Sequence, residues 1–519
     1  MLLVVAVAAI AAIGYSLGSG DAREASQPPP PAEPPDRPPV VLVVFDEFPA
    51  DDLLEPGGQI DAARFPHFAA LARTSTWFPN GSTVFDSTFK AVPAILDARL
   101  PRPRTAADVR SHQPSIFHLM HGLGYGVIKV ESASALCPPW ICPGARTRRP
   151  GVLARLAGGG RPARLNHWIG ALRRRPQPTF YLHHTLLPHE PWIYLPSGHQ
   201  SRPSGEDPIP GINRRVGFHN PSLTDHNHLR HLLQVGFVDH ELGLIMRRMR
   251  RTGIFDDAIF IVVADHGYSF DLHVAGRRQV RDDNIEEIGP VPFFVKAPGQ
   301  TRGVVDPSLV RNVDVVPTIA DLLNTNVTWQ NDGYSAFSEV TRARDQVKIE
   351  RRDFGRAVTI GRDALEVARE AVRRRRAEKF GTGADSEREF GDPWASAYRI
   401  GPHPELLGRS IEHARLGRGS VRAQVANGRL MKDVDPRERI LPSRVVGRLR
   451  GSSRGEVRDL AVALNGRIAA VGRSFWLRGR RSEFFSVMVP ETSLHPGRNR
   501  VDVLEVRRGG SLARLGTAP

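Results

Sequence analysis

Two segments of the sequence end an apolar run on side chains that are costly to bury. In IFIVVADHGYSF the run is followed by Asp265 and His266, and in PVVLVVFDEFP it is followed by Asp46 and Glu47. β-Branched and aromatic runs of this length predict buried strands. Carboxylates and an imidazole at neighbouring strand ends can bind a divalent cation. The alternative is that Asp265 caps a helix beside a hydrogen-bonded His266.

A hydroxyl residue accompanies these acids. Thr88 lies in VFDSTFKAVPAILDARLPR, ahead of an apolar helix that we expect from about Ala91 to Ala98. Because a helix N-terminus favours anions, a threonine there can act as a metal-ligated nucleophile. Lys90 can neutralise an oxygen of a phosphate or sulfate group. The alternative is that Ser87 or Thr88 only caps the helix.

These residues need a scaffold that brings distant segments together. Strand-like runs, including YGVIKV, TFYLHHTLL and VPFFVKAPG, alternate with helical patterns such as FPHFAALARTS and VDVVPTIADLLN. This alternation predicts an α/β fold with a mostly parallel sheet sandwiched by helices. Open sheets of this class place their sites at the carboxyl ends of the strands.

The composition changes beyond about residue 331. A strongly basic helix is expected over Asp363–Phe380, and the tail has short alternating runs, with a tight hairpin turn at Asn465 and Gly466. We predict five parts: a transmembrane anchor (1–20), a Pro-rich linker (21–38), a catalytic domain (39–335), a basic helical extension or linker (336–419) and a small β-rich accessory domain (420–519).

The N-terminal segment MLLVVAVAAIAAIGYSLG carries no charge. About 18 apolar residues form a helix of roughly 27 Å, which just spans a bilayer core. Because the positive start of a signal peptide is missing, we favour an uncleaved anchor. The last helix of a longer membrane domain is the alternative. The following QPPPPAEPPDRPP predicts a stiff polyproline spacer.

The net charge of +16 favours anionic partners, and arginine runs at 247–251 and 373–376 contribute to it. Such runs usually form solvated helix faces. Neither zinc-finger spacing nor an RNP pattern is present, so nucleic acid is not an expected partner.

Other catalytic motifs are incomplete or missing. HELGL, which begins at His240, lacks the second histidine of a zinc protease, and no P-loop or G-x-S-x-G elbow is found.

The sequence contains two cysteines, Cys137 and Cys142, between prolines in ALCPPWICPG. Their spacing predicts a small disulfide loop, which together with the anchor favours an oxidising, external compartment. Two unrelated thiols are the alternative. A metal site is disfavoured because no other cysteine can complete it.

Taken in order, Asp46, TFKAVPAIL, LPHEPWIYLPSG, VVADHGYSF, VPFFVKAPGQ and VDVVPTIADLL resemble the sulfatase branch of the alkaline phosphatase superfamily. The resemblance covers roughly residues 40–324, and ADHG together with the later PT-containing helix carries it. It implies that Asp46, Thr88, Asp265 and His266 bind one Mn or Zn ion, with Ca or Mg as alternatives. Glu47 is a neighbour that can substitute for Asp46.

The resemblance also implies roles around the transferred group. Thr88 is the nucleophile, with its hydroxyl pKa lowered by the metal, and His189 in PHEPW contacts the transferred group or protonates the leaving oxygen. Arg277 and Arg278 are candidates for binding the substrate anion, or else surface charges. Members with two zinc ions have a second ligand set, for which the stand-ins are Asp239, His240 and His184.

One departure from the family decides the expected chemistry. Sulfatases usually convert Cys or Ser in C/S-x-P-x-R to formylglycine, but TFKAV lacks this pattern, and CPGAR, which begins at Cys142, has its proline one position too early. We therefore expect an unmodified threonine, as in phosphodiesterases and phosphoglycerol transferases of the family.

We accordingly predict a membrane-anchored hydrolase or transferase of phosphate or sulfate esters, with phosphoester chemistry favoured. Its catalytic domain is expected on the extracytoplasmic side, and lipid or cell-envelope polymer is the expected substrate class. The competing hypothesis is a non-catalytic envelope scaffold with a degenerate site. The joint presence of Asp46, Thr88, Asp265 and His266 argues against it, and metal analysis of the purified protein discriminates the two.

Overall fold

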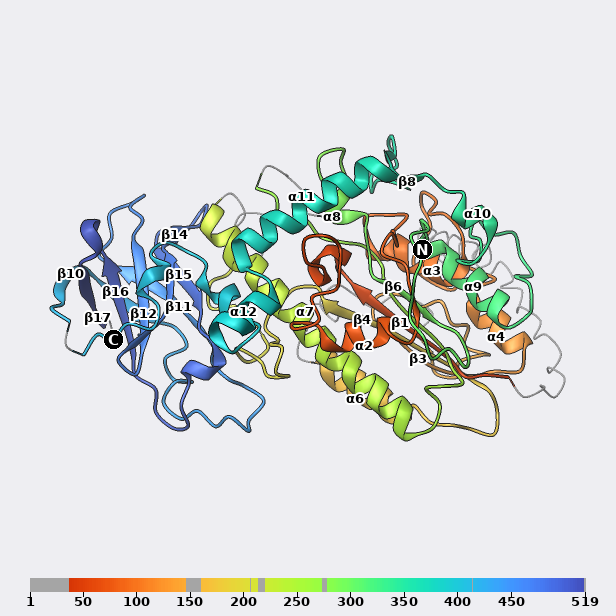
Figure 1. The fold of residues 1–519 in the computed structure, drawn as a ribbon, viewed down its shortest axis with the longest axis horizontal. Helices are drawn as coiled ribbons and strands as arrows, with labels where there is room; N and C mark the ends of the chain where they lie inside the picture. The colour runs from red at the N-terminus through yellow and green to blue at the C-terminus, as the bar shows by residue number, and fades with distance from the viewer. Residues whose placement is uncertain are drawn as a thin grey trace, which may run out of the picture.

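A computed structural model describes residues 37–145, 160–205, 207–212, 220–272, 278–412 and 414–517. Figure 1 shows an α/β part on the right and an all-β part on the left, with helices α7 (Pro221–Arg251) and α11 (Arg362–Phe380) running between them. The predicted anchor, 1–20, and nearly all of the predicted linker lie outside the described residues. Within those residues, no helix has the length and apolar character needed to cross a membrane.

The α/β part is built on a seven-stranded sheet in the order β3-β4-β1-β5-β6-β2-β7. Strand β1 (Val40–Asp46) is central and pairs in parallel with β4 (Thr179–Pro188) and β5 (Ile259–Ala264). The predicted mostly parallel sheet is therefore confirmed. The remaining strands are β3 (Gly126–Glu131), parallel to β4; β6 (Phe293–Lys296), antiparallel to β5; and β2 (Thr76–Trp77) and β7 (Val304–Val305) at the far edge.

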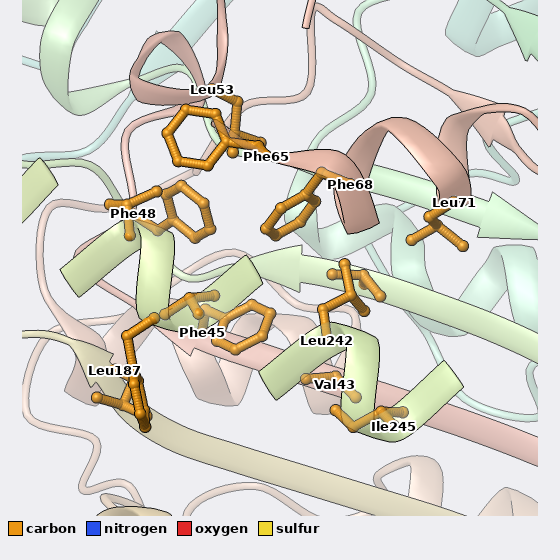
Figure 2. Packing of buried hydrophobic residues seen from close by; sticks show 14 of the residues in the cluster. Val43, Phe45, Phe48, Leu53, Phe65, Phe68, Leu71, Leu187, Leu242 and Ile245 are labelled. Atoms are coloured by element: carbon orange, nitrogen blue, oxygen red, sulfur yellow. The ribbon is translucent and has the colours of Figure 1, made fainter. Parts of the chain in front are cut away.

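Helices cover both faces of this sheet, which explains why its central strands are apolar throughout. Side chains alternate along β1, so Val43 and Phe45 pack on one face and Leu42 and Val44 on the other. Figure 2 shows the first face, where Phe45 packs near Leu242 of α7. Helices α2 (Pro66–Ala72) and α6 (Arg161–Ala171) join α7 there, and α3 (Thr88–Asp97), α4 (Ile116–Gly122) and α9 (Val315–Leu322) cover the opposite face.

The C-terminal part is an eight-stranded sheet, which confirms a β-rich C-terminal domain. Its β12–β13 hairpin turns at Asn465 (φ 51°) and Gly466 (φ 84°), the left-handed backbone of the tight turn that the Asn-Gly pair predicts. Its strands are β10 (Gly417–Val425), β11 (Arg444–Arg450), β12 (Asp459–Leu464), β13 (Arg467–Arg473), β14 (Phe475–Trp476), β15 (Glu483–Met488), β16 (Val501–Val506) and β17 (Leu512–Thr517).

Buried charges tie this sheet to α7. Arg444 of β11 donates to Asp207 Oδ2 at 2.6 Å, and Arg202 and Arg230 approach the same oxygen at 3.5 and 3.8 Å. All three arginines are at most 5% exposed. Burial opposes ionisation of Asp207, but the three guanidinium groups outweigh it and hold the pKa of Asp207 below its usual range.

The segment between the two sheets packs against the α/β part. It contains α10 (Glu339–Arg342), the hairpin β8 (Gln346–Ile349) and β9 (Val358–Gly361), α11 and α12 (Gly383–Phe390). After β8, the N–H of Glu350 donates to the Val84 carbonyl at 3.0 Å, and Arg352 donates to the Asp86 carbonyl at 2.9 Å. This segment therefore lines the chain just ahead of Thr88, although the predicted domain boundary at 335 separates the two.

Helix α11 occupies the range predicted for a basic helix, but its arginines do not all face solvent. Arg369 Nε and Arg373 NH1 donate to the Asp51 carboxylate at 2.9 and 3.0 Å, and both arginines are 1% exposed. The run at 373–376 is therefore only partly a solvated face. The charge of Arg373 is compensated inside the protein rather than by an external anion.

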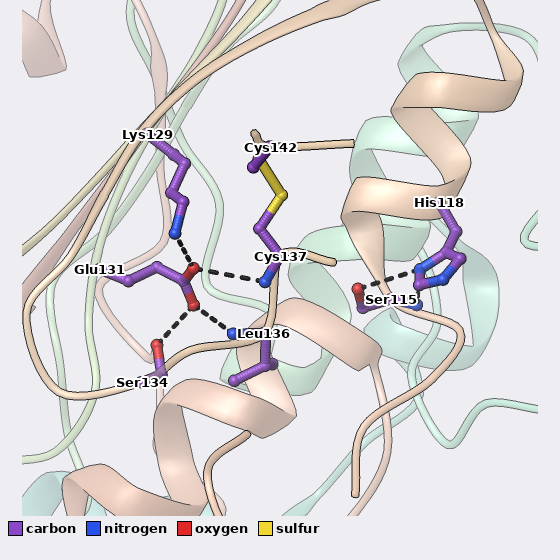
Figure 3. Close-up of a disulfide and its surroundings, with 8 residues drawn as sticks. All are labelled: Ser115, His118, Lys129, Glu131, Ser134, Leu136, Cys137 and Cys142. Atoms are coloured by element: carbon purple, nitrogen blue, oxygen red, sulfur yellow. Dashed lines mark hydrogen bonds and ion pairs between the residues drawn. A yellow bond between two sulfur atoms is a disulfide. The ribbon is translucent and has the colours of Figure 1, made fainter. Parts of the chain in front are cut away.

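Cys137 and Cys142 form the predicted disulfide, with 6.1 Å between their Cα atoms. Figure 3 shows how the loop is fixed beside it by Glu131, at the end of β3. The Glu131 carboxylate accepts hydrogen bonds from Leu136 N at 2.7 Å and Ser134 Oγ at 2.9 Å, and pairs with Lys129.

Candidate active site

The strand register brings the predicted site residues to one edge of the sheet. Asp46 lies opposite Pro188 of β4, and Phe45 lies opposite Ala264 of β5. His189 follows β4 directly, and Asp265 and His266 follow β5. Because the three strands are parallel, their carboxyl ends coincide, as predicted.

Thr88 joins this cluster from the start of helix α3. Its Oγ1 atom lies 3.1 Å from Asp46 Oδ1 and 3.3 Å from His266 Nε2. Thr88 is the first residue of α3, which begins three residues earlier than predicted because the Ser87 carbonyl already accepts from Lys90 N and Ala91 N, both at 2.9 Å. The Ser87 side chain makes no capping hydrogen bond, and the Thr88 hydroxyl contacts Asp46 and His266.

His266 presents a lone pair to this cluster. Its Nδ1 atom lies 2.8 Å from the Gly267 carbonyl, which can only accept, so Nδ1 carries the proton of the neutral ring. Nε2 is then free of a proton and faces Thr88. Asp265 is held by its own neighbours, since Oδ1 accepts from Glu47 N at 3.2 Å and the Asn312 side chain donates to the Asp265 carbonyl at 3.0 Å.

Gly267 is required by close backbone contact. A β-carbon at this position would lie 2.1 Å from the Glu287 carbonyl oxygen. We expect Gly267→Ala to cost at least about 1–3 kcal/mol of unfolding free energy and to displace His266. Gly122, at the end of α4, has open space around its β-carbon position. Gly122→Ala should therefore be neutral or stabilise by up to about 1 kcal/mol. Urea unfolding of the two variants checks this, and equal stability losses would contradict it.

Three acidic groups are buried at this edge. Asp46, Glu47 and Asp265 are at most 1% exposed. Burial, and next the Asp265 carboxyl, raise the pKa of Asp46 to about 7; burial likewise raises the pKa of Asp265 to about 7. To stay ionised at such depth, carboxylates require a compensating positive charge.

The donor set fits a divalent cation. Asp46, Glu47 and His266 each offer a ligand atom within 4.8 Å of the others, and so do Asp46, His184 and Asp265. Asp265 Oδ2 is buried without a hydrogen-bond partner among the described residues. Carboxylates and neutral imidazoles are ligands of Zn and Mn, and the Thr88 hydroxyl adds an oxygen.

Glu47 connects the buried acidic cluster to Arg278 and His189. Its backbone is left-handed (φ 60°), and its carboxylate forms an ion pair with Arg278 Nε and lies 3.7 Å from His189 Nε2. Arg278 in turn donates to His189 Nε2 at 3.0 Å. With its side chain 34% exposed, Arg278 is accessible to an anion at this edge. Arg277 lies outside the described residues.

His189 is neutral in this arrangement. Burial, and next the charges of Arg278 and Arg161, hold its pKa well below the usual value. Nδ1 lies 2.7 Å from the Glu190 carbonyl and so carries the proton, leaving a lone pair at Nε2. Proton donation from His189 therefore requires that the ring first gain a proton, and this role stays a prediction.

Two residues that the sequence did not single out hold the His189 loop. The buried Arg161, at the start of α6, donates to the carbonyl of Glu190 at 2.6 Å. Gln234 of α7 donates to the carbonyl of Pro188 at 2.7 Å and accepts from Ile193 N at 2.9 Å. Their sequence surroundings carry no motif, and only the tertiary structure reveals these contacts.

Other predicted residues have different partners. Lys90 Nζ donates to the carbonyl and hydroxyl oxygens of Thr105 at 2.8 and 2.6 Å, so its described contacts lie away from the metal ligands. Asp239 accepts from Phe68 N at 2.8 Å at the start of α2, a structural role. Of the three proposed stand-ins for a second metal, His184 belongs to a ligand group among the described residues, while Asp239 and His240 belong to none.

Comparison with known proteins supports the resemblance. Residues 163–325 match the model of the Sulfatase family. The multifunctional alkaline phosphatase superfamily protein PehA of Trinickia caryophylli is 29% identical over 101 residues, 19% of each chain. Human N-acetylglucosamine-6-sulfatase is 26% identical over 207 residues, 35% of this chain and 37% of that protein. The match thus spans about a fifth of the length of the first relative and just over a third of the second.

Among solved structures, the phosphonate monoester hydrolase of Agrobacterium radiobacter aligns with a TM-score of 0.43 at 16% identity, covering 64% of this chain and 83% of that one. The family match confirms the sulfatase resemblance predicted from the sequence. It contains His189, Asp265 and His266, whereas Asp46 and Thr88 lie before it in the chain.

Proposed function

We propose that the chain is a metal-dependent hydrolase or transferase of phosphate or sulfate esters that uses Thr88 as its nucleophile, with phosphoglycerol-type phosphoester chemistry favoured. The position of the Thr88 hydroxyl carries this proposal. It lies 3.1 Å from Asp46 Oδ1 and 3.3 Å from His266 Nε2, so its proton has an acceptor within reach. A hydroxyl held against a base is the arrangement that activates a nucleophile.

The pairing of the two cysteines supports a nucleophile that is an unmodified threonine. Both cysteines of the sequence are joined in the disulfide. Cys142, the nearest match to a formylglycine precursor, is therefore engaged elsewhere. An unmodified hydroxyl suits phosphoryl transfer, in which a covalent phosphothreonine is formed and then resolved.

In the first step, the Thr88 oxygen attacks the phosphorus or sulfur atom while its hydroxyl proton passes to the Asp46 carboxylate, which lies 3.1 Å away. The bond to the leaving oxygen breaks, and that oxygen takes up a proton from water. Water or an acceptor alcohol then attacks the threonine ester and releases Thr88. The guanidinium of Arg278 lies at the same edge and can hold an anionic oxygen during both steps.

A divalent cation held by Asp46, Asp265, His266 and Thr88 would lower the pKa of the Thr88 hydroxyl and offset the negative charge of the substrate. Zn or Mn fits this mixed oxygen and nitrogen set. The same cation would compensate the buried carboxylates, so the site has a structural reason to bind it.

We further propose that residues 1–20 anchor the chain in the cell membrane, with the catalytic domain on the extracytoplasmic side. The disulfide supports this placement, because disulfides persist in oxidising compartments. The substrate would then be an anionic ester of a lipid or a cell-envelope polymer.

Mass spectrometry of the trapped intermediate tests this function. The full chain, loaded with Mn or Zn, is mixed with glycerophospholipid vesicles, an aryl phosphodiester or an aryl sulfate, and quenched. We expect a phosphoryl-type adduct on the peptide that contains Thr88, and none in Thr88→Ala. A sulfuryl adduct alone would overturn the preference for phosphorus, and turnover without any Thr88 adduct would overturn the nucleophile.

A further inference from the structure

His184 has no partner in the described structure that explains its burial. It lies on β4 opposite Val44 of β1 and is 0% exposed. Neither of its ring nitrogens has a hydrogen-bond partner among the described residues. A buried polar group left in this state costs about 1–3 kcal/mol, so a buried histidine normally has a partner.

Two buried carboxylates lie near this ring. One ring nitrogen of His184, one oxygen of Asp46 and one oxygen of Asp265 lie within 4.8 Å of one another. Ligand atoms bound to one cation at about 2.0–2.2 Å are separated by at most about 4.4 Å. Small side-chain shifts therefore bring the three atoms to a common cation.

The state of the ring also suits a ligand. A neutral imidazole carries a proton on only one of its two nitrogens, so the other nitrogen offers a lone pair to a cation. An ionised carboxylate cannot satisfy that lone pair, because it is itself an acceptor. A cation between His184, Asp46 and Asp265 would bind one nitrogen of the ring and one oxygen of each carboxylate.

We infer that His184 is a further ligand of the cation bound by Asp46, Asp265, His266 and Thr88. The inference rests on the proposed metal-dependent function. It adds that the site draws ligands from three neighbouring strands and contains two imidazoles. Imidazole ligands favour Zn, Mn or a similar transition metal, whereas Ca and Mg are bound mainly by oxygen.

The chain offers a matched control beside it. His183 precedes His184 on β4 and is equally buried, at 1% exposed. Because side chains alternate along a strand, its ring points to the opposite face of the sheet, where it packs on Trp168 with 5.1 Å between the ring centroids. His183 belongs to neither ligand group.

Metal binding by the full chain in detergent tests the inference. The metal-free protein is titrated with Zn²⁺ and with Ca²⁺ by competition against a chromophoric chelator. We expect His184→Gln to raise the Kd for Zn²⁺ by at least about 10-fold, and His183→Gln to change it by less than about 3-fold. We also expect the wild type to bind Zn²⁺ at least about 100-fold more tightly than Ca²⁺. Equal Zn²⁺ affinity in folded His184→Gln, or tighter Ca²⁺ binding, would overturn the inference.

X-ray absorption of the Zn²⁺-loaded wild type provides a test that needs no variant. Imidazole ligands give a recognisable multiple-scattering pattern, and we expect two of them. A single imidazole overturns the inference even if His184→Gln fails to fold. These measurements do not depend on turnover. A protein with two imidazole ligands but no ester-cleaving activity would therefore contradict the proposed function and support the role of His184.

Discussion

Thr88→Ala is expected to lower metal-dependent cleavage of an aryl phosphodiester by at least about 10³-fold, because the attacking oxygen is removed. The stability of the protein should change little. The Thr88 side chain contributes one or two hydrogen bonds at a partly exposed position, which corresponds to about 1 kcal/mol. Initial rates at saturating metal, measured beside a urea unfolding curve, separate the two effects.

Thr88→Ser is the matched control for this variant. It keeps a hydroxyl at the same position and removes only a methyl group, so measurable metal-dependent cleavage and a threonine-like covalent adduct on the serine are expected. If Thr88→Ala cleaves as fast as the wild type, the reaction does not pass through this side chain. In that case the cluster around Asp46 would have to activate water instead.

Asp207→Asn should be among the most destabilising single substitutions outside the site. Its carboxylate lies between Arg202, Arg230 and Arg444, all buried. Removing the negative charge leaves three guanidinium groups close together, and breaking a buried pair in this way costs about 3–5 kcal/mol. Because Arg444 belongs to β11 and Arg230 to α7, we expect the C-terminal sheet to separate from α7 early in unfolding.

The same substitution at a surface pair provides the control. Asp257 pairs with Arg174, and both side chains are more than half exposed. Asp257→Asn should cost less than about 1 kcal/mol. Urea unfolding followed by circular dichroism compares the two, and similar midpoints for both variants would contradict a stabilising role for Asp207.

The pH dependence of Asp207→Asn is fixed by the lowered pKa of Asp207 in the folded protein. A group with a lowered folded pKa stabilises the protein above its unfolded pKa and loses that contribution as the pH falls toward the folded value. The stability difference between wild type and Asp207→Asn should therefore be complete at neutral pH and shrink below about pH 4.

The sheet could be predicted from the sequence because its strands are buried on both faces. The apolar runs that precede Asp46 and Asp265 became β1 and β5, which are adjacent and parallel. In a parallel sheet the carboxyl ends of the strands share one edge, so the fold class predicted Asp46, Asp265 and His266 at the same edge. The order of strands did not follow, because the antiparallel pairing of β6 depends on packing between distant segments.

Side-chain direction could not be predicted in the same way. Lys90 is only two residues from Thr88, yet its ammonium is held by Thr105 rather than at the site. Arg373 lies in a run of arginines that predicts a solvent-exposed helix face. In the structure it nevertheless binds Asp51, which is 322 residues away in the sequence. Such long-range charge pairs leave no periodic signal in the chain.

The position of Glu47 restricts which residues can replace it. Its left-handed backbone, at φ 60°, costs an ordinary side chain about 1–2 kcal/mol, a strain that glycine would relieve and that asparagine or aspartate tolerates better. Only glutamate has the length and charge with which the present carboxylate meets Arg278 and approaches His189. Relief of backbone strain and retention of the ion pair thus select different amino acids. Few amino acids should therefore be accepted at position 47. In a library randomised at this residue, the most stable variants should differ from the variants that retain function.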